Sequence, residues 1–141
     1  MNLLRIFLLS ALIALILSSC SKSDEQILNG TPYSLPYGEW VSGPDVQLQL
    51  SDSILDSRCP ETVICVWQGM AEGLMTMKIQ GINHKLPFQI QGLCDASLSE
   101  CGNVLDTLGY QIRFIRIDPY PQMPNDIPQK DYILQVDVVK K

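Results

Sequence analysis

The chain has 141 residues and a formal charge of −5, but its charged and apolar residues are unevenly distributed. Residues 1–19 contain one charged residue, Arg5, whereas residues 20–141 carry all 15 acidic residues and the other nine basic ones, a net charge of −6. The second segment is long enough for one domain with a hydrophobic core and too short for two. An acidic balance without clusters of Lys or Arg also argues against nucleic acid as a partner.

The first nineteen residues are organised like a secretory signal peptide. A short, weakly basic start precedes the apolar run Ile6–Leu17, which ends in small residues. A helix of that run would be about 18 Å long, well short of the roughly 30 Å hydrocarbon core of a bilayer. The alternative is a buried core helix, but no other segment of the chain is suited to cover a helix that is apolar on all sides.

The signal ends in Leu17-Ser18-Ser19-Cys20, which resembles the lipobox of bacterial lipoproteins. The resemblance implies a diacylglyceryl thioether on Cys20, cleavage before it, and attachment to a membrane through acyl chains. Ser21 in the next position implies the outer membrane of the cell envelope, facing the periplasm or the surface. The alternative is an ordinary secreted protein cut nearby, which would leave Cys20 as an odd thiol.

Residues 20–36 predict a flexible tether between the lipid and the folded domain. The segment is rich in Ser, Asn, Gly and Pro and shows no sustained period. Within it, Ser21–Glu25 resembles the short acidic tags that bring lipoproteins of Bacteroidetes to the cell surface, although a solvated charged tether has the same composition. We therefore expect a single β domain over residues 37–141.

Beyond the tether, apolar and polar residues alternate with period two, which is typical of half-buried β-strands. The alternating segments are residues 46–51, 75–80, 85–91, 110–118 and 132–138. A turn at Gly81–His84 would join the second to the third, and Pro87 would place the third at an edge or a bulge. After Phe114 the apolar residues change face, which indicates a bulge or a strand covered on both faces.

The strand count predicts an all-β fold. About six strands and at most one short helix, near residues 97–107, describe a small antiparallel β-sandwich or barrel. The segment Pro119–Pro128 contains four prolines, which exclude regular structure there.

Four cysteines remain in the expected domain: Cys59, Cys65, Cys94 and Cys101. An even number in an exported domain favours disulfides, and three connectivities are open. We favour Cys59–Cys65 and Cys94–Cys101, because each pair closes a short loop that contains turn-forming residues. The alternative is a zinc site with four thiolates, but its ligands are usually spaced by two to four residues, and the spacings here are wider.

The densest motif surrounds the first pair and reads Asp56-Ser57-Arg58-Cys59-Pro60, four residues, then Cys65-Val66-Trp67-Gln68-Gly69-Met70-Ala71. It resembles a pattern in a group of short, functionally uncharacterised bacterial lipoproteins and secreted proteins. Later elements of that pattern match Gly109-Tyr110-Gln111-Ile112 and Asp118-Pro119-Tyr120-Pro121. The resemblance covers about Val46 to Val139. It does not indicate what activity the protein has. Cys94 and Cys101 are not part of the pattern, so their pairing rests on the cysteine count alone.

The motif predicts a corner braced by a disulfide. Arg58 lies close in sequence to Asp56 and Glu61 and can form a bidentate ion pair with one of them. Trp67 can cover the cystine or the edge of the core. The corner either only closes the fold or presents a loop to a partner, and in the second case Arg58, Trp67 and Tyr120 are the candidate interaction residues.

The sequence contains no recognisable catalytic or metal-binding constellation, so we expect no enzyme, cofactor or metal site. His84 is the one histidine, and no nucleophile elbow, phosphate loop or calcium loop is present. Two non-enzymatic functions remain. The first is an accessory lipoprotein that docks an envelope protein or a small ligand through a sheet face or the loop around Tyr120. The alternative is a protease inhibitor that offers the Arg58–Cys65 loop as a rigid substrate mimic.

Overall fold

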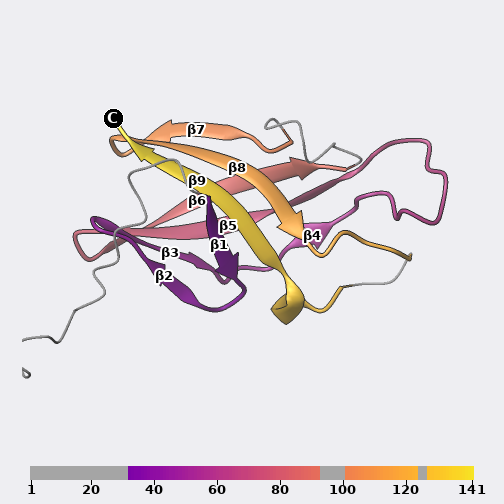
Figure 1. Ribbon diagram of the computed structural model, residues 1–141, viewed down its shortest axis with the longest axis horizontal. Helices are drawn as coiled ribbons and strands as arrows, with labels where there is room; N and C mark the ends of the chain where they lie inside the picture. The colour runs from indigo at the N-terminus through magenta and orange to yellow at the C-terminus, as the bar shows by residue number, and fades with distance from the viewer. Residues whose placement is uncertain (1–31, 93–100, 124–126) are drawn as a thin grey trace, which may run out of the picture.

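The computed structural model describes residues 32–92, 101–123 and 127–141, and these residues form two antiparallel β-sheets. The elements are β1 (Tyr33–Pro36), β2 (Trp40–Ser42), β3 (Val46–Leu50), β4 (Leu55–Asp56), β5 (Met70–Ile79), β6 (Ile82–Gln91), β7 (Val104–Thr107), β8 (Tyr110–Asp118), the 3₁₀ helix η1 (Gln129–Asp131) and β9 (Ile133–Lys140). In Figure 1, β8 and β9 cross in front of β5 and β6. The predicted all-β class is confirmed. The predicted signal peptide and Cys20 lie outside the described residues.

One sheet has the strand order β1-β9-β8-β7, and in the other β5 pairs with β3 and β4 along one side and with β6 along the other. The core lies between the sheets and is filled by every second residue of their strands. In β3, for example, Val46, Leu48 and Leu50 are buried while the two glutamines between them are partly exposed. The period-two alternation therefore predicted which side chains of this strand face the core.

Backbone hydrogen bonds join the two sheets at both edges. At one edge, Tyr37 donates its N–H to the Tyr132 carbonyl over 3.0 Å and forms a bridge with Leu50 of the other sheet. At the opposite edge, the segment Cys101–Asn103 bonds β6 on one side and Phe114 of β8 on the other. A Cβ on Gly102 would lie 2.1 Å from the Phe114 carbonyl oxygen, so only glycine fits there. The architecture is thus a sandwich whose edges are closed by short segments.

Two hairpins differ from the prediction. The turn between β5 and β6 is Gln80–Gly81, with φ values of 50° and 84°, so Ile82–His84 belong to β6 and not to a turn. The helix expected near residues 97–107 is wrong for Val104–Thr107, which form β7 and pair with β8 across a turn at Leu108 and Gly109. Residues 97–100 lie outside the described part of the chain. Both turns adopt positive φ, which favours a two-residue hairpin over a longer turn or a helix.

Short strands account for the remaining differences. Nine strands occur among the described residues, against about six expected, because segments of two to four residues are too short to show a period. One of them, β1, lies within the predicted tether and pairs with β9, so the folded domain begins at least four residues before residue 37. The bulge in β8 after Phe114 and the edge position of β6, with its Pro87, are as predicted.

No helix within the described ranges has the length and apolar character needed to cross a membrane.

Tyr33, the first residue of β1, places a polar atom in the core. Its side chain is buried, and its hydroxyl has no hydrogen-bond partner among the described residues. Burial, together with the charge of Asp137, raises the pKa of Tyr33 to about 12. The hydroxyl therefore stays neutral at physiological pH.

We expect Tyr33→Phe to raise the free energy of unfolding by about 1 kcal/mol, because the substitution removes a buried, unpaired hydroxyl and keeps the ring. Tyr132→Phe is the matched control, since it deletes a hydroxyl that donates a hydrogen bond and should lower stability by a similar amount. Urea denaturation at pH 7 measures both. A loss of stability in Tyr33→Phe would contradict the burial of an unpaired group.

Candidate functional site

The loop between β4 and β5, residues 57–69, projects from one end of the sandwich (Figure 1). The segment between β8 and β9 lies at the same end, because Glu61 donates its N–H to the Pro121 carbonyl over 3.1 Å. Gly92, just after β6, also reaches this end and donates its N–H to Gly69. This end therefore gathers the connections that join different strands, which is where binding residues of β-sandwiches usually lie.

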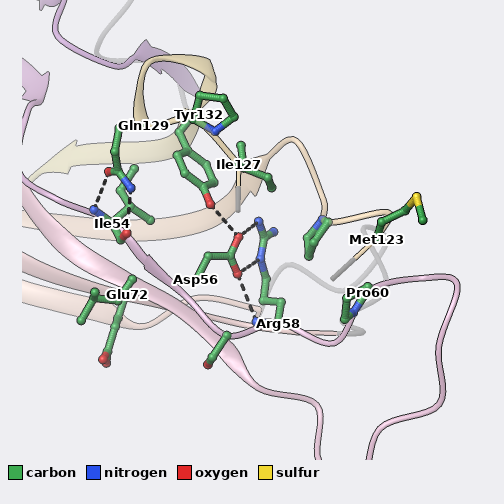
Figure 2. A pocket seen from close by; sticks show the side chains of 13 residues that line it. Ile54, Asp56, Arg58, Pro60, Glu72, Met123, Ile127, Gln129 and Tyr132 are labelled. Carbon is green, nitrogen blue, oxygen red and sulfur yellow. Dashed lines mark hydrogen bonds and ion pairs between the residues drawn. The ribbon is translucent and has the colours of Figure 1, made fainter. Parts of the chain in front are cut away.

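Arg58 lies at the base of this loop and is almost completely buried, with 2% of its side chain exposed. Its Nε donates to Asp56 Oδ1 over 2.9 Å and its Nη2 to Asp56 Oδ2 over 2.6 Å, a bidentate pair that Figure 2 shows from close by. Of the two predicted carboxylate partners the structure selects Asp56. Glu61 instead accepts a hydrogen bond from Gln122.

The other side of the Arg58 guanidinium bonds the end of β8. Nη1 donates to the Ile117 carbonyl over 2.8 Å and Nη2 to the Pro119 carbonyl over 2.9 Å. The guanidinium carbon lies 4.9 Å from the centre of the Tyr120 ring, close enough for a cation–π contact. Arg58 thus fastens the start of the loop to a segment about sixty residues later in the chain.

This placement changes the predicted roles of two candidate interaction residues. Arg58 was a candidate interaction residue only if the corner presents a loop to a partner; its side chain is buried, and two backbone carbonyls and a carboxylate compensate its charge inside the domain. Tyr120 stacks on Arg58 and donates its hydroxyl to the Cys59 carbonyl over 2.9 Å. Both side chains support the loop from below.

Asp56 is the anion of this buried cluster. Its Oδ2 also accepts a hydrogen bond of 3.0 Å from the Tyr132 hydroxyl. Burial alone would raise the pKa of Asp56, but the hydrogen bonds and charge of Arg58, with the Tyr132 hydroxyl, outweigh it and hold the pKa below its ordinary value. Tyr132 itself is buried, with 2% of its surface exposed.

The disulfide predicted between Cys59 and Cys65 is confirmed, with 5.9 Å between the Cα atoms. Backbone hydrogen bonds close the loop below it, from Cys59 N–H to the Gln68 carbonyl and from Ser57 N–H to the Met70 carbonyl. Gly69 permits this closure, since its φ is +66° and a Cβ there would lie 1.8 Å from the Ser57 carbonyl oxygen.

The loop tip, Ile64–Trp67, points into solvent. Ile64 is 103% exposed, Val66 101% and Trp67 76%. Trp67 had two possible roles, covering the cystine or the core edge and contacting a partner, and the structure leaves its indole mostly exposed. Ile64 and Val66 were not predicted as interaction residues. The signal for them is that apolar side chains flank a cysteine in a segment with no strand partner.

An open cleft of about 880 Å³ lies beside the buried cluster (Figure 2). The polar side chains in its wall are already engaged. Gln129 bonds both the N–H and the carbonyl of Ile54, and the carboxylate of Asp56 receives Arg58 and Tyr132. Within the described residues, no group of three or more His, Cys, Asp or Glu could hold a metal ion.

The remaining cysteines are only partly within the described chain. Cys101 is buried and disulfide-bonded, and its partner lies outside the described residues, as do Cys94 and Cys20. The predicted Cys94–Cys101 pair therefore stays a prediction.

Comparison of the chain with protein families, with curated proteins and with solved structures finds no match. The candidate site is accordingly defined by its geometry alone.

We expect Asp56→Asn to destabilise the domain by about 3 to 5 kcal/mol at pH 7, because it leaves the buried Arg58 charge without its anion. The lowered pKa of Asp56 sets the pH dependence. The ionised Asp56 side chain stabilises the folded domain fully above about pH 4, and this stabilisation is lost as the pH falls through the lowered pKa of Asp56. The free energies of unfolding of the wild-type protein and of Asp56→Asn should therefore become equal in acid. Urea denaturation between pH 2.5 and pH 7 measures this.

Asp52→Asn is the matched control, because Asp52 pairs with Lys85 on the surface and both side chains are well exposed. We expect a change below about 1 kcal/mol for it. Equal effects of the two substitutions would contradict the anchoring role of Asp56.

Proposed function

We propose that the protein is a lipid-anchored lipoprotein of the bacterial outer membrane, with no enzymatic activity, whose β domain binds a partner through the loop tip Ile64–Trp67. One observation carries the proposal. The loop is clamped at its base by a disulfide and a buried arginine, yet its large apolar side chains are almost fully exposed.

The exposure of the loop tip has a free-energy cost in water. A large aliphatic side chain gains about 1.5 to 3 kcal/mol when it is buried, and Ile64 and Val66 gain none of it within this domain. No charged residue occurs from Thr62 to Met70, although the domain as a whole is acidic. Contiguous exposed apolar side chains of this kind mark interaction sites.

The rigid base supports binding. Ordering a loop on association costs free energy, and a loop that is already ordered avoids that cost. Here the disulfide, the Arg58 cluster and the bond from Thr62 Oγ1 to the Gln122 carbonyl hold the loop before any partner arrives. Trp67 adds the aromatic side chain that most often dominates the free energy of protein interfaces.

The position of β1 is compatible with a lipid anchor before the domain. Tyr33 pairs with Val136, in the middle of β9, and β1 then runs toward the end that carries the loop. The chain therefore enters the domain beside the middle of β9, and not at the end of the sandwich that carries the loop. A lipid on Cys20 would leave residues 21–32 as a tether and the loop tip accessible to a partner.

The binding part of the proposal is tested by crosslinking in intact envelopes. A photoreactive amino acid at position 66 should give a reproducible adduct with one partner. The same probe at position 82 should not, since Ile82 is also exposed but lies on the hairpin at the other end of β5. Equal or absent adducts at both positions would contradict binding through the loop tip.

The anchoring part predicts that Cys20→Ser abolishes incorporation of a labelled fatty acid and moves the protein out of the membrane fraction, because the thioether needs the thiol. Cys59→Ser, which removes a disulfide cysteine, should keep the label. Unchanged membrane association of Cys20→Ser would show that the anchor lies elsewhere.

A further inference from the structure

We infer that the loop tip binds in the active-site cleft of an endopeptidase that prefers aliphatic side chains, and that it acts there as a substrate-like inhibitor with Ile64 in the specificity pocket. The inference rests on the proposed function, because it names the partner of the same loop.

The backbone of the loop tip is available for pairing. Within the described structure, no N–H or C=O group of Ile64–Trp67 makes a hydrogen bond, whereas Val63 on one side bonds Pro60 and Gln68 on the other bonds Cys59. Extended peptides are recognised by main-chain hydrogen bonds, with alternate side chains entering pockets. An endopeptidase binds the chain around its scissile bond in this way, so four unpaired peptide units on a projecting loop match its cleft.

The side chains select the class of endopeptidase. Ile64 and Val66 are both fully exposed, and Ile64 lies before the bend that the backbone makes at Val66 and Trp67. The loop contains one basic residue, Arg58, which is buried and bonded to Asp56, Ile117 and Pro119. The loop therefore offers no accessible side chain to an endopeptidase whose specificity pocket binds Lys or Arg, whereas Ile64 can enter a pocket that binds aliphatic side chains.

The disulfide explains why the loop would inhibit and not simply be digested. Hydrolysis of the Ile64–Cys65 peptide bond breaks its C–N bond and adds one water, giving a carboxylate on Ile64 and an amine on Cys65. That bond lies inside the ring closed by Cys59 and Cys65, so the two new ends stay joined through sulfur. Their recombination is then intramolecular and strongly favoured over that of separate fragments. Cleavage is thus reversible while the loop remains in the cleft.

The test uses the full chain purified from membranes in detergent, with elastase as the aliphatic-specific probe and trypsin as the counter-probe. We expect elastase inhibition with an inhibition constant below about 1 µM, and no inhibition of trypsin at about 10 µM. Ile64→Asp should weaken the inhibition of elastase at least about 100-fold, because a charge enters an apolar pocket. Ile82→Asp, at an exposed isoleucine away from the loop, should change it less than about twofold.

A second variant separates inhibition from simple binding. Replacing both Cys59 and Cys65 by Ser should convert the inhibitor into a substrate, cut between residues 64 and 65 and detected by mass spectrometry. Absence of elastase inhibition by the wild-type chain, equal inhibition of trypsin, or an Ile64→Asp variant that inhibits normally would each overturn the inference. If the probe at position 66 then crosslinks a partner that is not a protease, the proposed function stands and only this inference fails.

Discussion

The ion pair between Arg58 and Asp56 is the interaction on which this end of the protein depends. A buried guanidinium requires acceptors, and here they come from the carboxylate two residues earlier and from the carbonyls of Ile117 and Pro119. These acceptors belong to different sheets, so compensating one charge also sets the distance between the end of β4 and the end of β8. The position of the loop between β4 and β5 is therefore set by the acceptors that the buried Arg58 guanidinium needs. Removing one partner of such a pair is strongly destabilising, because it leaves an uncompensated buried charge.

The disulfide and the ion pair act on different parts of the loop. The ion pair fixes where the loop starts, and the cystine limits the shapes that residues 59–65 can take. Neither covers the loop tip, which is left with exposed apolar side chains and unpaired backbone. The division explains how a small domain can hold a loop rigidly and still leave the apolar side chains of its tip exposed.

The fold could be predicted where long strands alternate, and the site only in part. Val46–Leu50 and Tyr110–Asp118 carry enough residues for period two, and the bulge after Phe114, to be visible, whereas β4 has two residues and no period. The cystine and the bidentate Arg58 pair followed from short sequence separations. The Ile117 and Pro119 carbonyls did not, because a backbone acceptor has no sequence signature. The two alternatives for Trp67, covering the cystine or core edge and being presented to a partner, could not be separated from the sequence, because a tryptophan suits both; in the structure its side chain is mostly exposed.

The segment Cys101–Asn103 protects an edge strand from pairing with neighbouring copies of the protein. It covers the outer edge of β6 near Gln89 and Gln91, and Pro87 beside it has no N–H to offer, while Lys85 adds a charge further along. An uncovered ten-residue edge strand would be a template for pairing with an identical neighbour. Wherever copies of the protein meet at high local concentration, an edge closed in this way keeps neighbouring copies from assembling into a continuous sheet.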